Sequence, residues 1–218
     1  MPDCSNYTYL AEVRAKAGET LAVYKPARGE TPLDDFPDGT LGKREVAAHL
    51  VSAALGWQIV PLTIYRTTGP LGPGSLQQFI AADPAEHYFT LMPQRADDFR
   101  TMAAFDVIVN NADRKSGHCL LDSTGHIWGV DNGLTFHPLP KLRTVIWEFA
   151  GEEVPAGLRA DTARLVAELT AGQRWVKALQ QLIAPAEIRA LILRARRLAD
   201  QGRYPEPVSR WAYPWPLI

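Results

Sequence analysis

Residues 110–133 carry the most informative sequence of the chain, NNADRKSGHCLLDSTGHIWGVDNG. A polar loop that contains Asp113 precedes two β-prone runs within residues 119–130, and Asp131 follows the second run. The Asp-Ser-Thr-Gly-His segment between the runs predicts a tight turn, and hence an antiparallel hairpin. Antiparallel pairing sets His118 opposite about position 131. The spacing therefore predicts a polar cluster of His118, Asp131 and the Asp113 loop at the open end of the hairpin.

Two charged residues of the N-terminal half stand where a phosphotransferase needs them. Lys25 ends a β-prone run, and Glu45 opens the next predicted helix. Phosphoryl transfer uses a carboxylate that accepts a hydroxyl proton, a second carboxylate for a divalent cation, and a lysine for phosphate oxygens. A simpler interpretation makes both aspartates turn caps, Glu45 a partner of the helix dipole, and Lys25 a solvated strand end. Spacing alone leaves both interpretations open.

Composition and charge narrow the class of protein. The chain has 218 residues, of which 46% are hydrophobic and 22% charged, as in ordinary globular proteins. Its net charge of −1 gives no global attraction to nucleic acid, and we expect no nucleic-acid partner. The sequence contains no apolar run of transmembrane length. The first residues lack the pattern of a signal peptide, so we expect a cytoplasmic protein.

The order of predicted elements indicates an α+β fold with two lobes. The expected elements are a hairpin within residues 7–25, a helix over 43–55 closed by Gly56, strands over 59–66 and 76–81, a helix over 96–111, the hairpin described above, and three helices within 161–201. We place the lobe boundary near Asp83-Pro84, which gives a β-rich lobe at 1–82 and an α-rich lobe at 83–218. The Pro-rich tail is expected to be extended, with Trp211, Tyr213 and Trp215 packed onto the body.

Four motifs resemble one known family. They are Val23-Tyr24-Lys25-Pro26, Lys43-Arg44-Glu45-Val46-Ala47-Ala48, Asn110-Asn111-Ala112-Asp113-Arg114-Lys115 and Val130-Asp131-Asn132-Gly133-Leu134-Thr135-Phe136. In this order they resemble the small actinobacterial proteins classed as phosphatidylinositol 3/4-kinase-like, within the protein-kinase-like superfamily. The likeness runs from about Ser5 to Gly151. It implies a kinase-like fold with ATP in the cleft between the lobes.

The resemblance also implies a role for each matching residue. Lys25 would hold the ATP phosphates, Glu45 would orient that lysine, and Asp113 would be the catalytic aspartate. Asp131 would bind the metal ion, and His118 stands where the family has a metal-binding asparagine. The remaining implied nucleotide-binding residues are the hinge residues Gln78, Phe79 and Ile80, together with Ser5 and Asn6 at the phosphate-covering hairpin.

The activity that follows is transfer of the γ-phosphoryl group of Mg-ATP, or Mn-ATP, to a hydroxyl acceptor that the sequence does not name. Two departures from the family pattern bear on it: His118 replaces the asparagine, and the Asp131-Asn132-Gly133 segment lacks the usual phenylalanine. Two other functions use the same residues. One is a nucleotide-binding pseudokinase that serves as a regulatory module, and the other is adenylyl transfer with the nucleotide reversed.

Overall fold

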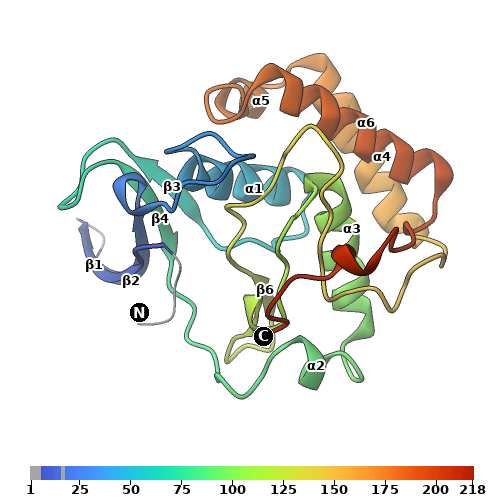
Figure 1. Ribbon diagram of the computed structural model, residues 1–218, viewed down its shortest axis with the longest axis horizontal. Helices are drawn as coiled ribbons and strands as arrows, with labels where there is room; N and C mark the ends of the chain where they lie inside the picture. Colours follow the sequence, from blue (N-terminus) through green and yellow to red (C-terminus); the bar gives the residue numbers. More distant parts are fainter. Residues whose placement is uncertain (1–5, 16–17) are drawn as a thin grey trace.

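The computed structural model describes residues 6–15 and 18–218. Its N-terminal part is a four-stranded antiparallel sheet in the order β1-β2-β4-β3 (Figure 1). The strands are β1 (Tyr9–Ala15), β2 (Gly18–Pro26), β3 (Thr63–Arg66) and β4 (Gly74–Gln78). The expected N-terminal hairpin is confirmed, although residues 16–17 of its turn lie outside the described residues. Strand β3 begins later than expected, because the backbone N–H groups of Ile59 and Val60 donate to the buried Ser52 hydroxyl instead of a strand partner.

The rest of the chain is mainly helical. The helices are α1 (Leu41–Leu55), α2 (Tyr88–Leu91), α3 (Ala96–Val109), α4 (Ala156–Ala171), α5 (Arg174–Leu179) and α6 (Pro185–Gln201), with short 3-10 turns η1 (Ala27–Gly29), η2 (Ser116–His118) and η3 (Arg210–Ala212). Helix α1 packs against β3 and β4, whereas α3, α4 and α6 form the body of the C-terminal part (Figure 1). The α+β fold class, with an antiparallel sheet followed by helices, is confirmed. The boundary between residues 82 and 83 stays a prediction.

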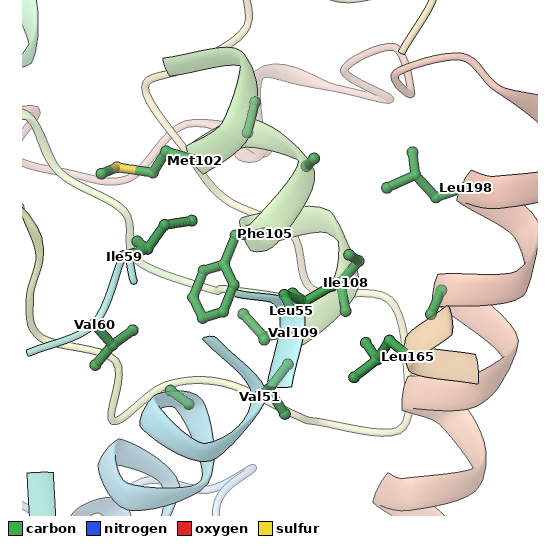
Figure 2. Close-up of a cluster of buried hydrophobic side chains, with 14 of the residues drawn as sticks. Val51, Leu55, Ile59, Val60, Met102, Phe105, Ile108, Val109, Leu165 and Leu198 are labelled. Carbon is green, nitrogen blue, oxygen red and sulfur yellow. The ribbon is translucent and has the colours of Figure 1, made fainter. Parts of the chain in front are cut away.

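The main hydrophobic core joins α1 to the C-terminal helices. Figure 2 shows Val51 and Leu55 of α1 against Phe105 and Ile108 of α3, with Leu165 of α4 on the same cluster. All five side chains are buried. Burial of side chains of this size contributes on the order of 1.5–3 kcal/mol each. The core therefore fixes α1, which carries Glu45, against α3, which leads into the Asp113 loop.

The predicted central hairpin is confirmed as β5 (Cys119–Leu121) and β6 (Ile127–Gly129). Its register pairs Cys119 with Gly129, and the Val130 N–H donates to the His118 carbonyl at 2.9 Å. His118 is therefore opposite Val130, one residue away from the expected partner. Asp131 adopts a left-handed conformation, with φ of 57°, directly after this pair. Its carboxylate nevertheless reaches the His118 ring.

The packing predicted for the C-terminal tail is partly wrong. Trp211 and Trp215 are 68% and 87% exposed, and Tyr213 is half-exposed. The reason is the η3 turn, which directs the small side chain of Ala212 inward in place of its aromatic neighbours. Among the helices of residues 6–15 and 18–218, none combines the length and apolar character that crossing a membrane requires.

Candidate active site

Lys25 joins the sheet to both halves of the site. It lies near the end of β2, opposite Ser75 of β4. Its Nζ lies 2.7 Å from Glu45 Oε1 and 2.8 Å from Asp131 Oδ1. Burial alone lowers the pKa of this ammonium, but the Asp131 and Glu45 carboxylates raise it above its usual range. Lys25 is therefore a fixed cation, as binding of phosphate oxygens requires.

Glu45 is positioned by α1 and held from two sides. Its side chain is only 3% exposed, and its second oxygen, Oε2, accepts the backbone N–H of Asn132 at 3.1 Å. The adjacent Arg44 is also buried, and its charge is paired with that of Glu187 of α6, with Nη2 2.6 Å from Oε1. The two neighbouring charges thus face different partners. Glu45 ties the lysine and the Asp131 segment to one helix.

A pocket of about 140 Å³ opens beside this ion-pair network. Five residues predicted for the site line it: Asn6, Lys25, Glu45, Asp113 and Asp131. Another part of its wall includes Glu30 and Thr31 from the segment before α1, together with Leu134. Asn6 Oδ1 accepts the Thr31 N–H at 2.7 Å, so the N-terminal segment is attached to that wall. Cationic, acidic and apolar groups therefore converge on one cavity.

Asp113 has the electrostatics of a proton acceptor. Its side chain is 28% exposed, and the Lys115 ammonium lies 3.4 Å from Oδ2. Burial raises the pKa of Asp113 to about 6, against the opposing effect of Lys115 and with a smaller contribution from the Asp131 charge. A carboxylate with a pKa just below neutrality is ionised at pH 7 and still basic enough to accept a proton.

Asp131 offers one carboxylate to a cation, with His118 beside it. The nearby Lys25 ammonium holds the pKa of Asp131 below its usual range, so the carboxylate is ionised. The His118 Nε2 lies 3.4 Å from Asp131 Oδ2, and burial lowers the pKa of His118 to about 4. The Lys115 N–H donates to His118 Nδ1 at 3.3 Å. The neutral ring therefore carries its proton on Nε2 and donates toward Asp131 in this arrangement.

The donor set suits a cation that arrives with a nucleotide. In the described ranges, 6–15 and 18–218, no group of three or more His, Cys, Asp or Glu side chains could hold a metal ion. Magnesium is commonly held by one or two carboxylates together with substrate phosphates and water. Asp131, which is 49% exposed, fits such a site. The role of His118 as a second ligand stays a prediction, since that role needs the Nε2 lone pair.

A buried ion pair beneath the loop was not anticipated from the sequence. Arg114 is fully buried and makes a bidentate contact with the buried Asp106 of α3, with Nε to Oδ2 at 3.1 Å and Nη2 to Oδ1 at 3.0 Å. The same guanidinium donates to the Val130 carbonyl at 2.7 Å and to Asn132 Oδ1 at 2.8 Å. Arg114 thus connects the Asp113 loop to both sides of Asp131. The only sequence signal for this ion pair was Asp106, a single carboxylate within the otherwise apolar run 105–109.

The predicted hinge lies away from the pocket. Within the described residues, the pocket lining includes none of Gln78, Phe79 and Ile80. The Gln78 N–H donates to the Leu62 carbonyl and the Phe79 N–H donates to the Leu21 carbonyl. Both donors are therefore used in hydrogen bonds within the N-terminal part. Contact of this run with adenine stays a prediction, as does the role of Asn6. Ser5 lies outside the described residues.

Comparisons with known proteins identify the family and the fold of the chain. Residues 43–185 match the family described as phosphatidylinositol 3- and 4-kinase. The protein Rv2133c of Mycobacterium tuberculosis is 41% identical over 249 residues, which cover 98% of this chain and 88% of that protein. The crystal structure of a Helicobacter pylori proinflammatory kinase, CtkA, is similar in fold, with a TM-score of 0.51 at 10% identity over 94% of this chain and 92% of that one.

The family match includes Glu45, Asp113 and Asp131 but begins after Lys25. The assignment of Lys25 therefore depends on its geometry, which places it in contact with two of the matched residues. The fold, the order of the motifs and the extent of the sequence match lead to one conclusion. This chain belongs to the phosphatidylinositol 3- and 4-kinase family.

Proposed function

We propose that this protein is an ATP-dependent phosphotransferase that moves the γ-phosphoryl group of Mg-ATP to a hydroxyl acceptor. One observation carries the proposal. Lys25 Nζ contacts Glu45 and Asp131 at 2.7 and 2.8 Å, on a pocket that Asp113 also lines. Phosphoryl transfer depends mainly on positioning and on charge stabilisation, and these groups supply both.

Each residue has a distinct part in the proposed reaction. Lys25 binds phosphate oxygens, and Glu45 keeps its ammonium in place. Asp113 accepts the proton of the acceptor hydroxyl as the oxygen attacks the γ-phosphorus, the bond from that phosphorus to the β–γ bridging oxygen breaks, and ADP leaves. Lys115 is close enough to Asp113 to offset the negative charge nearby. Asp131 would hold the divalent cation, which would neutralise charge on the phosphates. The family kinship supports a kinase-type reaction, and the proposal leaves the identity of the hydroxyl acceptor open.

ATP labelled separately on the α and the γ phosphate tests the proposal. We expect γ label to reach the acceptor, or water at a slower rate, while α label stays on the nucleotide. Transfer of α label would indicate adenylyl transfer. If the protein binds Mg-ATP but both labels stay on the nucleotide, the protein is a pseudokinase. Either of these two results would contradict the proposal.

Nucleotide binding should depend on Lys25. The Lys25→Met variant keeps most of the apolar side chain and removes a charge-assisted contact with phosphate, which contributes on the order of 1.5–3 kcal/mol. We expect ATP affinity measured by calorimetry to fall at least about tenfold. Lys177→Met, on the exposed surface of α5, is the matched control and should bind like the parent. Unchanged affinity in Lys25→Met would remove this lysine from the site.

Magnesium dependence should require Asp131. Asp131→Asn keeps the shape of the side chain and removes the charge that a divalent cation prefers. We expect the variant to lose the increase in ATP-induced thermal shift that magnesium gives the parent. His118→Asn should retain that increase, because Asp131 remains. An equal magnesium response in Asp131→Asn and the parent protein would refute the metal-binding role.

A further inference from the structure

The C-terminal residues 203–218, here called the C-terminal strap, cross the helical part of the molecule. Helix α6 ends at Gln201 and is capped by Gly202. Tyr204 then anchors the strap, with its hydroxyl donating to the Arg100 carbonyl at 2.9 Å. In Figure 1 the strap, in dark red, runs from the end of α6 past α3 to a C-terminus beside β6. This path brings the end of the chain to the hairpin that bears the site.

One backbone carbonyl of the strap binds the loop that contains Asp113, and a second binds the segment that pairs with this loop. The Ser116 N–H donates to the Leu217 carbonyl at 2.8 Å. The Ala212 carbonyl accepts the Thr144 N–H at 3.0 Å and the Trp147 indole N–H at 3.1 Å. Thr144 in turn lies opposite Arg114 in an isolated parallel bridge. The strap therefore contacts the loop directly at Ser116 and indirectly through Thr144.

Ser116 is a buried junction between the candidate catalytic and metal-binding residues. It is 0% exposed and lies three residues after Asp113 and two before His118. Its hydroxyl lies 3.0 Å from Nδ1 of His87, at the start of α2. A buried N–H without a hydrogen-bond partner is unfavourable, so loss of the Leu217 carbonyl would favour movement of Ser116 toward water.

Beyond Tyr204, residues 208–218 of the strap are held by backbone hydrogen bonds and by the small buried side chains of Ala212 and Pro214. Ala212 is 3% exposed, whereas Trp211 and Trp215 are mostly in solvent. Side-chain burial therefore gives little support to residues 208–218, and the hydrogen bonds to the loop carry most of the specific contact. The strap also lies beyond residues 43–185, the part of the chain that matches the family.

We propose that the C-terminal strap is a positioning element, which fixes the 113–118 loop so that Asp113 faces the transferring phosphoryl group. This inference rests on the proposed function, because it assigns the strap a role in that reaction. A small displacement of a reacting group strongly lowers the rate of the chemical step, but it leaves remote binding contacts intact. The strap should therefore act on turnover and have little effect on nucleotide affinity.

The test compares the parent protein with a chain that lacks residues 208–218 and with Ala212→Glu, which forces a charged side chain into a buried position. Trp215→Ala is the matched control on the same strap, since its side chain is 87% exposed. We expect both strap variants to lower kcat for γ-phosphoryl transfer about 10- to 100-fold, with the KM for ATP within about twofold of the parent. Hydrogen exchange at the Ser116 amide should be at least about tenfold faster.

The readouts separate failure of this inference from failure of the proposed function. Parent-like Ser116 exchange in the shortened chain overturns the inference, as does faster exchange with unchanged kcat. An equal loss of kcat in Trp215→Ala also overturns the inference, because the exposed aromatic side chain would then be responsible for the effect. If the shortened chain does not fold, Trp147→Phe takes its place in the test. This variant keeps an aromatic ring and removes the indole N–H that binds the Ala212 carbonyl, and we expect the same changes in kcat and in Ser116 exchange. Absence of transfer by the parent protein overturns the proposed function itself, whatever the exchange rates show.

Discussion

Asp113→Asn is expected to lower the turnover number for γ-phosphoryl transfer by roughly 10²- to 10⁴-fold, with little change in ATP affinity. Asparagine has nearly the same shape but cannot accept the acceptor's proton at neutral pH. The Lys25 contacts to Glu45 and Asp131 remain in place, so nucleotide binding is preserved. Initial rates and calorimetry on the same preparations measure both quantities.

Asp122→Asn is the matched control for the turn-cap interpretation of Asp113. Asp122 is a turn cap, since its Oδ1 accepts the backbone N–H groups of Thr124 and His126 at 2.8 and 3.0 Å. We expect this control to change the melting temperature and to leave transfer unchanged. Full activity in Asp113→Asn, together with a similar melting shift, would reduce Asp113 to the same structural role.

The pH profile gives a second signature of Asp113. Burial raises the pKa of this carboxylate to about 6, and the ionised form is the one that accepts a proton. Therefore kcat/KM should be level above about pH 6 and fall tenfold per pH unit below it. In Asp113→Asn the residual rate should lose this slope. An unchanged slope would assign the titration to another group.

Asp106→Ala should have the largest effect on folding. It leaves the fully buried Arg114 guanidinium without its carboxylate partner, and removal of one member of a buried ion pair costs about 3–5 kcal/mol. Chemical denaturation should show this loss in the free energy of unfolding. Asp97→Ala, on the same helix, is the control, because its carboxylate is 98% exposed and its pair with Arg100 is on the surface.

A double variant, Asp106→Leu with Arg114→Met, separates stability from positioning. Apolar replacement of a buried pair is often neutral or stabilising, so stability should return toward that of the parent. The contacts from Arg114 to Val130 and Asn132 are still absent, so transfer should stay low. Recovery of both stability and transfer would show that the pair does not position the site.

Local sequence patterns predicted the elements that carry the site. The turn segment 122–126 between two β-prone runs predicted the β5–β6 hairpin, and the helical spacing of residues 43–55 predicted the helix that holds Glu45. The meeting of His118 and Asp131 followed from strand pairing, although the register differs by one residue. The left-handed φ of Asp131, 57°, compensates for that difference, and no local pattern encodes it.

Contacts between distant segments were less accessible to sequence reasoning. The position of Glu45 beside Lys25 and Asp131 required the resemblance to a known family, since spacing relates neither residue to the hairpin. Asp106 could be noticed as a charge in an apolar helix, but its partner Arg114 could not be identified before the loop was folded. The tail shows the converse error, because its aromatic residues suggested burial and the structure buries Ala212.

The position of a bound nucleotide tests the central claim most directly. We predict that a crystal structure with magnesium and a non-hydrolysable ATP analogue will show phosphate oxygens on Lys25, the cation on Asp131 and the γ-phosphoryl group facing Asp113. An α-phosphate facing Asp113, or a nucleotide bound away from the pocket between Lys25 and Asp113, would contradict the account.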